Sequence, residues 1–470
     1  MLTFLLVAIV ILAFFCHHRK RTYPRNTVGF LHSAAGAGGG GERVLWVALD
    51  GLQRADAHKG VVRQYVVFTN EYKPAAKSST ESSDQHLLLL VEKQFNIRPL
   101  RPVRFVYLRP ALTRWLSSDA YPRLTLLLQT LCGGAALFYE VAVANAATPI
   151  VVETLGVPFA YPLLRLLAGC TVISYTHYPV ISSAMTERVR SGEVSHTNSL
   201  TVARNPILRF AKVVYYEIFT LLYRCMGYFP NVVLTNSSWT QNHVQSLFWP
   251  RRCLRLYPPC DVGGFRAESR PPALRKNRIV SVGQFRPEKN HMLQLEAFHL
   301  AQPRLPDDAT LVLIGGVRNE GDRQRVAQLQ ACAEEMGIGN RVEIMVNATV
   351  SEVRAELGSC VIGLHTMRDE HFGIVLLEYL AAGCIPLGHR SGGVELDIVK
   401  SPDLGFLAVT SEEYAAAMVK ICEMRLCHPE RYTQFQQRGR EHVKSFDDSS
   451  FRTRFVELLG SCFYAGVQAV

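Results

Sequence analysis

The sequence predicts an α/β protein with two domains, each built on a doubly wound parallel sheet. Three observations lead to this prediction. Segments of strand composition alternate with segments of helical periodicity, and this alternation occurs twice along the chain. The chain has 470 residues, of which 48% are hydrophobic, and this is enough for two cores. Glycine-rich loops directly follow several of the expected strands, as they do in doubly wound sheets.

The charge of the chain favours an anionic partner. The 51 Lys and Arg residues against 40 Asp and Glu residues give a formal net charge of +11, with a pI of about 9.1. A membrane surface, a polyphosphate ligand or a nucleic acid would suit this charge, but the sequence has no nucleic-acid recognition motif. We therefore expect no nucleic-acid partner. The 12 cysteines are scattered without zinc-site spacing, so we expect reduced thiols and no metal site.

The N-terminus carries a predicted membrane anchor. Residues 2–16 are apolar apart from Thr3, and a basic run follows at 17–21. As a helix at ~1.5 Å per residue the apolar run spans about 22–24 Å, which is short of the ~30 Å hydrocarbon core. The basic run favours an uncleaved anchor at 1–21 that keeps the rest of the chain on the cytosolic side. A cleaved signal peptide and a helix lying on the membrane surface are the alternatives.

The first domain is expected at residues 22–262. A short buried strand at 27–32 leads into a glycine loop at 36–41, and a helix begins near Glu42. This order is typical of a nucleotide-binding α/β fold, in which loop amides and the helix N-terminus bind an anion. The alternative is a tight glycine turn without a ligand. Further strands are predicted at 62–69, 150–153, 171–175 and 232–235.

Two stretches of the first domain are unusually apolar, at 124–144 and 149–171. Charged residues such as Glu140 and Glu153 interrupt them, which favours buried helices and strands over membrane spans. Partial immersion in a bilayer is a third interpretation. In that case the segment 210–229, which mixes aromatic and basic residues, would lie on the same membrane-facing side.

A polar stretch rich in Gly, Pro and Arg, at 263–276, is expected to join the two domains. The second domain is expected at 277–445 and alternates more clearly. Its strands are predicted at 278–282, 309–314, 342–345, 361–365 and 385–387, and its helices at 292–301, 325–336, 351–357 and 372–382. The last segment, 446–470, is predicted to be a helix that could pack back on the first domain.

Two carboxylates eight residues apart, Glu370 and Glu378, form the most informative pair in the sequence. They lie where a predicted strand leads into the helix at 372–382. This would place Glu370 at the helix start and Glu378 two turns into it, about 12 Å further along the axis. Such a span suits a nucleotide sugar whose diphosphate lies at the helix N-terminus. The alternative is that Glu370 stabilises the helix dipole and that Glu378 is solvated.

Other strand-end residues are expected to meet this pair. Arg286 and Lys289 follow the strand at 278–282 and supply two cations for a diphosphate. Ser391 and Gly392 follow the strand at 385–387. Because the carboxyl ends of parallel strands meet at one edge, we expect these loops to form one crevice.

One histidine of the first domain also follows a strand. His177 comes directly after the strand at 171–175 and stands beside a rigid turn at Pro179. A substrate contact and a satisfied structural histidine are the two interpretations.

Several motifs together resemble one known family. They are GAGGGGERVLW at 36–46, YTHYP at 175–179, NSSWT at 236–240, YPPCDV at 257–262, VGQFRPEKNH at 282–291 and EHFGIVLLE at 370–378. The family comprises the GDP-mannose:dolichyl-diphosphate-linked Man3GlcNAc2 α-1,2-mannosyltransferases of N-glycan assembly. The similarity extends over nearly the whole chain after the predicted anchor. EHFG…E alone is typical of the broad class of retaining glycosyltransferases, whereas YTHYP, NSSWT and GQFRPEKNH are far more specific.

The resemblance implies a glycosyltransferase B-type fold, in which two Rossmann-like domains face each other across a cleft. It implies mannose transfer from GDP-mannose to Man3GlcNAc2-PP-dolichol, twice in succession, on the cytosolic face of the endoplasmic reticulum membrane. Other mannosyltransferases of the same pathway are further expected partners. The resemblance also implies retention of the anomeric configuration, and we expect neither a metal ion nor another cofactor.

The resemblance assigns roles to single residues. Glu370 would bind the mannose hydroxyls, His177 the transferred mannose and Lys289 the diphosphate, and these three are the expected catalytic residues. Glu378 would bind the ribose. The expected donor-binding residues are Arg286, Lys289, Glu370, Phe372, Gly373, Glu378, Gly315, Ser391 and Gly392, and the expected phosphate or acceptor loop comprises Gly39, Gly40 and Gly41.

Other interpretations account for parts of the pattern. A sibling enzyme would keep the fold but use another sugar donor, linkage or lipid acceptor. A membrane-tethered scaffold would bind a sugar nucleotide without catalysis, although the presence of Glu370, Glu378 and Lys289 argues against it. The glycine loop alone would also fit a dehydrogenase, but two diphosphate loops and a spaced pair of glutamates would not.

Overall fold

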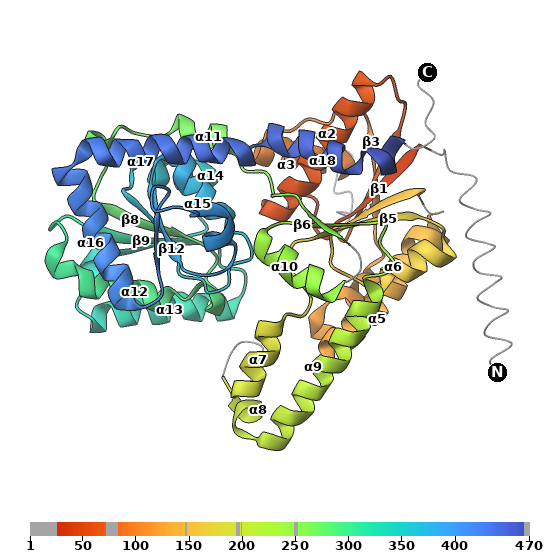
Figure 1. Cartoon of the computed structure of the whole chain (residues 1–470), viewed down its shortest axis with the longest axis horizontal. Helices are drawn as coiled ribbons and strands as arrows, with labels where there is room; N and C mark the ends of the chain where they lie inside the picture. Colours follow the sequence, from red (N-terminus) through yellow and green to blue (C-terminus); the bar gives the residue numbers. More distant parts are fainter. Residues whose placement is uncertain are drawn as a thin grey trace. The chain divides into compact units, whose positions relative to one another are not determined.

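The computed structural model describes residues 26–71, 83–145, 148–193, 198, 200–248 and 252–464. The anchor predicted at residues 1–21 lies outside the described residues. The chain forms two compact units (Figure 1). The first unit runs to Asn236 and includes Thr240–Pro259 and the chain from Phe451 onward, and the second unit holds Ser237–Trp239 and Cys260–Ser450.

A parallel sheet forms the centre of the first unit. Among the described residues it has seven strands, in the order β3-β2-β1-β4-β5-β6-β7. The strands are β1 (Thr27–Leu31), β2 (Gln64–Thr69), β3 (Val103–Tyr107), β4 (Ile150–Glu153), β5 (Thr171–Thr176), β6 (Val232–Thr235) and β7 (Cys253–Arg255). The chain therefore winds outward from β1 in one direction and from β4 in the other, which defines a doubly wound sheet.

Successive residues of these strands enter cores on opposite faces of the sheet. In β2, Tyr65 and Val67 belong to one core, and Val66 and Phe68 belong to the other. Burial on both faces explains why the strands are runs of apolar residues rather than alternating ones. The first core contains helices α2 (Gly40–His58), α3 (Ser83–Phe95) and α18 (Asp448–Tyr464), and the second contains α5 (Thr125–Phe138), the π-helical turn η3 (Tyr139–Ala144), α6 (Ala160–Pro162) and the π-helical turn η4 (Leu163–Leu167).

The C-terminal helix α18 belongs to the core of the first unit. Phe451, Phe455 and Phe463 pack in the same core as helix α2. A buried ion pair between Arg63 and Asp56, with an Nε to Oδ2 distance of 2.7 Å, lies beneath the helix. Because Arg63 also donates to the carbonyl of Phe463 at 2.9 Å, the end of α18 is held by a charged group.

Helices α7 to α10 complete the first unit. In Figure 1, α7 and α9 lie side by side and extend away from the sheet, with α8 near their tip. The bounds of the shorter and outer helices are α4 (Pro110–Thr113), η1 (Arg114–Leu116), η2 (Ser118–Ala120), α7 (Ser183–Ser191), α8 (Leu200–Arg204), α9 (Pro206–Met226) and α10 (Ser238–Leu247).

The predicted apolar stretches contribute to the core. Strands β4 and β5 are buried along nearly their whole length. Among the described residues one helical segment, Thr125–Ala144, is long and apolar enough to cross a membrane. Half of that segment is buried, as expected of a core helix.

The second unit contains another doubly wound parallel sheet. Within the described residues it has six strands, in the order β10-β9-β8-β11-β12-β13. The strands are β8 (Arg278–Val282), β9 (Thr310–Gly315), β10 (Val342–Val346), β11 (Ile362–Leu364), β12 (Ile385–His389) and β13 (Phe406–Ala408).

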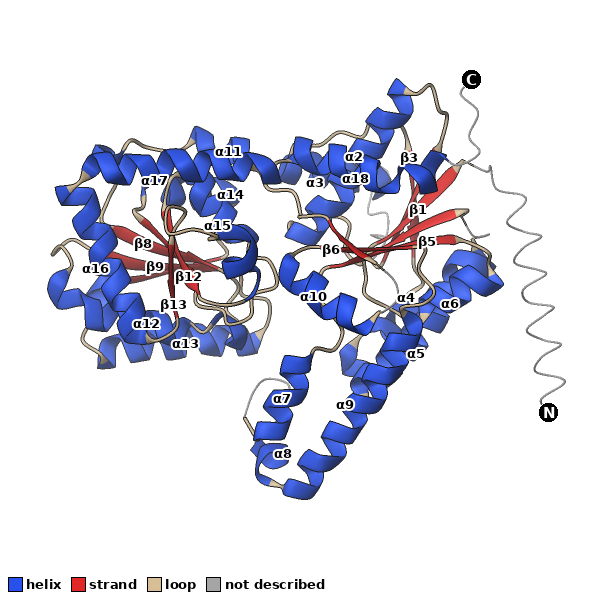
Figure 2. Ribbon diagram, in the orientation of Figure 1, coloured by secondary structure: helices blue, strands red, loops and turns tan. Residues whose placement is uncertain are grey.

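Helices cover both faces of this second sheet (Figure 2). Helices α12 (His291–Ala301), α13 (Glu320–Glu335) and α16 (Ser411–Cys427) lie on one face, and α11 (Val262–Ala267), α14 (Val350–Ser359) and α15 (Ile374–Ala382) lie on the other. The remaining elements are α17 (Pro429–His442) and the short turns η5 (Pro272–Leu274), η6 (Pro287–Lys289), η7 (Gln302–Arg304), η8 (Gly339–Arg341), η9 (Val394–Ile398) and η10 (Val443–Phe446).

The predicted fold class, two Rossmann-like α/β domains, is confirmed. The segment 263–276, expected to join the domains, forms parts of α11 and η5 and packs within the second unit. There the Ser269 hydroxyl donates to the carbonyl of Ala382 at 2.7 Å. Three helix starts were predicted incorrectly. Helix α2 begins at Gly40 rather than near Glu42, α13 begins before residue 325, and α15 begins after residue 372.

Candidate active site

The loops that follow β8, β9, β11 and β12 lie at one edge of the second sheet, because these strands are parallel and adjacent. The chain leaves β8 toward β9, whereas it leaves β11 toward β12 on the other side. The β8 and β11 loops therefore diverge at the point where a doubly wound sheet binds its ligands. The predicted donor-site residues lie in or beside these four loops.

Glu370 is the centre of a charged cluster at this edge. Its Oε2 atom lies 2.7 Å from the Lys289 ammonium and 3.1 Å from His365 Nε2. The Glu370 side chain is only 13% exposed. The β8 and β11 loops thus meet through one carboxylate, as the strand order predicts.

The surroundings of Glu370 keep it ionised. Burial alone would raise its pKa, but the hydrogen bond from His365 and the positive charge of Lys289 hold the pKa well below its usual range. The pKa of His365 is lowered, because burial and the Lys289 charge outweigh its bond to Glu370. A permanently negative group therefore lies beside a cation in a nearly buried site.

The backbone that carries Lys289 is fixed by a small polar network. The Thr366 hydroxyl donates to the Lys289 carbonyl at 2.8 Å and in turn accepts from Gln294 Nε2 at 2.8 Å. Asn290 takes a left-handed conformation, with a φ of 50°, and ends the turn η6. Arg286 lies in the same loop and is 3.7 Å from Glu288, with its side chain partly exposed. The backbone at Lys289 is therefore held in place, whereas the Arg286 side chain is 38% exposed.

The two predicted carboxylates do not share a helix. Helix α15 begins at Ile374, so Glu370 lies in the preceding loop and Glu378 lies on the helix, which corrects the predicted position of Glu370. The reason is Gly373, which has a φ of 94°. This backbone conformation is not helical and is readily adopted only by glycine, so the helix starts at the next residue. The first amides of a helix have no intrahelical acceptor, so the segment after Phe372 presents donors to an anion.

The loop after β12 supports the Glu370 loop. The Ser391 hydroxyl accepts from the Asp369 amide at 2.8 Å, and the Gly393 amide donates to the Glu370 carbonyl at 2.8 Å. Gly392 has a φ of 65° and packs so closely on the Glu370 backbone that a Cβ atom would not fit. Ser391 and Gly392, which were predicted to bind the donor, thus hold the Glu370 loop in place.

Gly315 also permits a close approach. A Cβ atom on Gly315 would overlap the Gly283 carbonyl and lie 2.9 Å from the Phe285 ring. A larger residue would therefore push the β8 and β9 loops apart.

A second cluster lies at the carboxyl edge of the first sheet. His32 follows β1, and its Nδ1 atom lies 2.7 Å from Thr154 Oγ1. Its Nε2 atom lies 3.2 Å from Glu42 Oε1 on helix α2. The glycines Gly39, Gly40 and Gly41 form the N-cap and first turn of α2, and a Cβ atom on Gly41 would lie 3.5 Å from His32 Cε1 and 3.7 Å from His177 Cε1. The glycine loop therefore admits two imidazole rings close to its backbone.

His177 has an unfilled hydrogen-bonding position. Its Nε2 atom is buried and has no hydrogen-bond partner among the described residues. The Asn236 amide donates to the His177 carbonyl at 2.8 Å, and the Tyr175 ring lies 4.8 Å from the imidazole. Burial, with a smaller effect of His32, lowers the pKa of His177 to about 4. The ring is thus neutral at physiological pH and available to a ligand.

The main residues of both clusters were predicted from the sequence, but some of their partners were not. His365, Thr366, His32 and Glu42 were not predicted as site residues. A signal was present for His32, because a histidine at a strand end is followed ten residues later by an acid in the first turn of a helix. Among the described residues no group of three or more His, Cys, Asp or Glu side chains is arranged to hold a metal ion.

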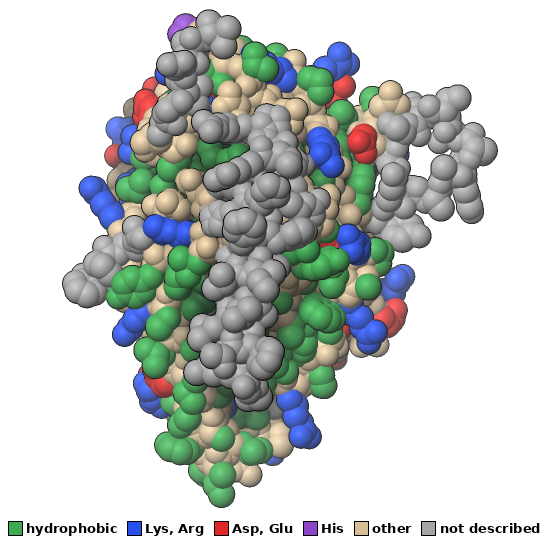
Figure 3. Space-filling view, turned by 90° about the vertical axis from the view of Figure 1, so that its right-hand side faces the viewer, with side chains coloured by type: hydrophobic (Ala, Val, Ile, Leu, Met, Phe, Trp, Pro, Cys, Tyr) green, Lys and Arg blue, Asp and Glu red, His purple; other side chains and the backbone are tan. Residues whose placement is uncertain are grey.

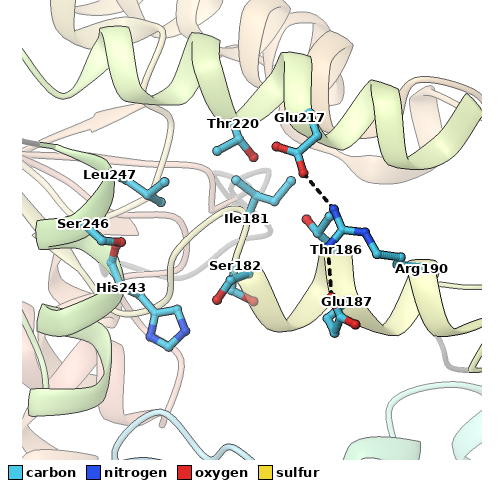
Figure 4. Close-up of a pocket in the computed structure, with 11 residues that line it drawn as sticks. Ile181, Ser182, Thr186, Glu187, Arg190, Glu217, Thr220, His243, Ser246 and Leu247 are labelled. Carbon is cyan, nitrogen blue, oxygen red and sulfur yellow. Dashed lines mark hydrogen bonds and ion pairs between the residues drawn. The ribbon is translucent and has the colours of Figure 1, made fainter. Parts of the chain in front are cut away.

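The first unit also contains a pocket of about 480 Å³ between helices α7, α9 and α10 (Figure 4). Arg190 lines one side of the pocket and pairs with Glu187 at 2.9 Å and with Glu217 at 3.4 Å. Hydroxyl groups of Ser182, Thr186 and Thr220 complete much of the lining.

Solved structures with the same architecture include a sucrose-phosphate synthase and a protein in complex with UDP-glucose. Sucrose-phosphate synthase from Thermosynechococcus elongatus matches with a TM-score of 0.65 and 15% identity, covering 94% of this chain and 100% of that one. The Anabaena protein HepE in complex with UDP-glucose matches with a TM-score of 0.60 and 16% identity, covering 93% and 99%. The fold and the strand-edge site define a glycosyltransferase of the two-domain B-type.

Sequence comparison identifies the family. The family model described as "ALG11 mannosyltransferase N-terminus" matches residues 25–248, and the model "Glycosyl transferases group 1" matches residues 266–442. The human GDP-Man:Man(3)GlcNAc(2)-PP-Dol alpha-1,2-mannosyltransferase is 39% identical, over 93% of this chain and 87% of its own length. The enzyme of the same name from Caenorhabditis elegans is 35% identical, over 91% and 90%. The chain belongs to this family of ALG11 mannosyltransferases.

Proposed function

We propose that the protein transfers mannose in α-1,2 linkage from GDP-mannose to Man3GlcNAc2-PP-dolichol, twice in succession, to give Man5GlcNAc2-PP-dolichol. The observation that carries this proposal is the Lys289–Glu370–His365 cluster at the donor edge of the second sheet. It belongs to a chain whose relatives are named for this reaction. An ionised carboxylate that is already paired suits the binding of sugar hydroxyls, because it accepts hydrogen bonds without a change of protonation.

Each donor group has a proposed binding residue. Glu370 binds the mannose hydroxyls, and Lys289 and Arg286 bind the diphosphate. The amides at Phe372 and Gly373 stabilise the charge that develops on the leaving GDP. Glu378 binds the ribose. Gly315, Ser391 and Gly392, the remaining predicted donor-binding residues, support the loops that carry these proposed contacts.

Residues of the first unit are proposed to bind the transferred sugar and the phosphates. The unpartnered Nε2 atom of His177 offers one hydrogen bond to the mannose, and its neutral imidazole adds no charge. The amides of Gly39, Gly40 and Gly41 approach the phosphates at the start of helix α2.

The proposed reaction is a front-face substitution that retains the anomeric configuration. The bond between mannose C1 and the phosphate oxygen breaks, and the bond between C1 and the acceptor O2 forms on the same face. The acceptor proton passes to the departing phosphate oxygen, so that the side chains do not have to supply a base. We propose that the reaction needs no metal ion, since Lys289, Arg286 and helix amides carry the compensating charge.

We further propose that the enzyme works at the endoplasmic reticulum membrane. In this proposal a single anchor within residues 1–21 holds the chain, with both units on the cytosolic side. The partners are GDP-mannose, the dolichyl-diphosphate oligosaccharide and other mannosyltransferases of the pathway. No nucleic acid is involved.

A transfer assay tests the proposal. Full-length protein is incubated with GDP-mannose and a phytanyl-diphosphate Man3GlcNAc2 acceptor in the presence of EDTA, and the glycan products are sized and digested with a linkage-specific mannosidase. The expected result is a Man5 product with α-1,2 linkages. Transfer only from another nucleotide sugar, or to another lipid acceptor, would assign the chain to a sibling reaction. Loss of all transfer in EDTA, restored by a divalent cation, would contradict the metal-free mechanism.

A further inference from the structure

Strands β8 and β11 pair over only part of their length. The ladder between them ends at the pair Val280 and Gly363. Each strand then continues beside its other neighbour, β8 as far as Val282 beside β9 and β11 as far as Leu364 beside β12. A fork therefore opens between β8 and β11 at the edge of the sheet that carries the candidate site.

The hydroxyl of Tyr379 bridges this fork. Tyr379 lies on helix α15, and its side chain is fully buried. Its Oη atom accepts from the Val282 amide at 2.9 Å and donates to the Leu364 carbonyl at 3.2 Å. Burial holds the pKa of this phenol well above its usual range, so the hydroxyl keeps the proton that it donates. One side chain thus satisfies two buried backbone groups that the ladder leaves without a partner across the fork.

The ring reaches the fork because Gly363 has no side chain. A Cβ atom on Gly363 would overlap the Tyr379 ring. A glycine inside a strand is unfavourable unless another group approaches closely, and here the tyrosine is that group. Leu376, Leu377 and Leu380, on the same helix, are buried. The helix is therefore fixed in the core and holds the phenol in one place.

The strand ends that Tyr379 bridges lead directly into two loops of the candidate site. After β8 comes the Lys289 loop, residues 283–290, and after β11 comes the Glu370 loop, residues 365–373. The two loops meet further out, where Lys289 Nζ lies 2.7 Å from Glu370 Oε2. The tyrosine hydroxyl therefore joins the loops at their base, and the ion pair joins them at the site.

We propose that Tyr379 is a positioning residue for mannose transfer, because its hydroxyl sets the spacing between the Lys289 loop and the Glu370 loop. This inference rests on the proposed function, in which Lys289 binds the diphosphate and Glu370 binds the mannose. The bond that breaks joins those two parts of the donor. The relative placement of the two loops therefore controls the alignment of the donor for transfer, and a small misplacement lowers the rate of the chemical step.

Steady-state kinetics test this role in the full-length protein. Tyr379→Phe keeps the ring and is expected to lower kcat for transfer from GDP-mannose by about tenfold or more. The Kd for GDP, which has no mannose to align, should change by less than about twofold. An unchanged kcat in Tyr379→Phe would overturn the proposal.

Tyr432→Phe is the matched control. Tyr432 is also fully buried, and its hydroxyl donates to the Val361 carbonyl at 3.1 Å, just before β11 at the opposite edge of the same sheet. Its loss removes a comparable hydrogen bond, so kcat should stay at the wild-type value. Equal falls of kcat in Tyr432→Phe and Tyr379→Phe would overturn the proposal.

A double-mutant cycle separates positioning from a general loss of stability. In a chain that already carries Glu370→Ala, the addition of Tyr379→Phe should lower kcat by less than about twofold, since the carboxylate that the hydroxyl places is absent. A full additional loss in that chain would show that Tyr379 acts independently of Glu370, and would contradict the proposed role.

Hydrogen exchange tests the bridge without the reaction. In Tyr379→Phe the Val282 amide loses its acceptor, so its exchange should be at least about tenfold faster, with faster exchange in both loops. Tyr432→Phe should leave these rates unchanged. Wild-type exchange at Val282 in Tyr379→Phe would overturn the proposal. If the wild-type protein transfers no mannose from GDP-mannose, the proposed function fails, whereas the exchange rates still decide whether Tyr379 holds the two loops.

Discussion

The strand-end clusters of the two units use the same kinds of residue in different ways. In the second unit Glu370 is bonded to both Lys289 and His365, so its charge is balanced before a ligand arrives. In the first unit Glu42 and His32 are paired, but the neighbouring His177 keeps a buried nitrogen without a partner among the described residues. A balanced charged site suits the charged donor that we propose for it, and an open position on a neutral ring suits the proposed bond to a sugar hydroxyl.

The largest expected effect comes from removing the central carboxylate. Glu370→Ala is expected to lower kcat/KM for mannose transfer by about 10²–10³-fold, because a preorganised polar contact to the transferring sugar is lost. Steady-state transfer assays measure the change. Glu335→Ala, on the exposed side of α13, is the matched control. If both variants kept wild-type rates, Glu370 would be a structural residue and the proposed contrast between the clusters would fail.

A second prediction concerns pH. Burial, and then the charges of Lys289 and Arg325, lower the pKa of His291 to about 4 from 6.5. Between pH 6.5 and 4 the unfolded chain binds a proton that the folded chain does not, so the free energy of unfolding falls as the pH is lowered. At about 1.4 kcal/mol per pKa unit, this amounts to roughly 3 kcal/mol.

Chemical denaturation at several pH values measures this effect. In His291→Gln the fall in the free energy of unfolding between pH 6.5 and 4 should be smaller by roughly 3 kcal/mol. Replacing the exposed His428 should leave this fall unchanged. An unchanged pH dependence in His291→Gln would show that the buried ring does not titrate as its surroundings imply.

Lys289 is expected to matter mainly for donor binding. Lys289→Ala removes a hydrogen bond to a charged group, worth about 1.5–3 kcal/mol, and should raise the KM for GDP-mannose by roughly 10- to 100-fold. Arg286→Ala should have a smaller effect, since Arg286 is more exposed and is not held by Glu370. A larger loss in kcat than in the affinity for GDP-mannose would place Lys289 at the chemical step instead.

The smallest effect is expected at a glycine. Gly373 has a φ of 94°, and a Cβ atom there would lie 3.0 Å from Leu376 Cδ1 and 3.1 Å from Val394 Cγ2. Gly373→Ala should cost about 1–2 kcal/mol of stability. Gly321→Ala, in helix α13 with ordinary backbone geometry, should not destabilise the protein, because alanine favours helices. Thermal unfolding distinguishes the two, and equal Tm values would contradict the strain argument.

The parts of the fold that repeat a simple pattern could be predicted from the sequence. Strands such as β4, β6 and β8 were predicted within a residue, because they are apolar runs buried on both faces. The parallel-strand rule also brought Lys289 and Glu370 together across 81 residues of sequence. Strands β3, β7 and β13 were missed. β3 is only partly buried and contains Arg104, and β7 and β13 have three residues each, so none of them shows a clear apolar run.

The details of the site could not be read from periodicity. The start of α15 depends on a positive φ at Gly373, and spacing alone does not distinguish such a glycine from a helical one. The partners His365 and Thr366 follow a strand as Glu370 does, but their roles depend on side-chain directions that only the folded loop defines. The segment 210–229 was noted in the sequence for its aromatic and basic residues, whereas the exposure of its apolar side chains on α9 required the structure. Figure 3 shows hydrophobic side chains gathered over the lower part of the view, where α8 and α9 lie.

A structure of the full-length protein with GDP-mannose bound tests the central claim most directly. The account predicts mannose hydroxyls on the Glu370 carboxylate and the diphosphate between Lys289 and the first amides of helix α15. It also predicts the ribose on Glu378. A donor bound elsewhere, for example in the pocket between α7, α9 and α10, would contradict it.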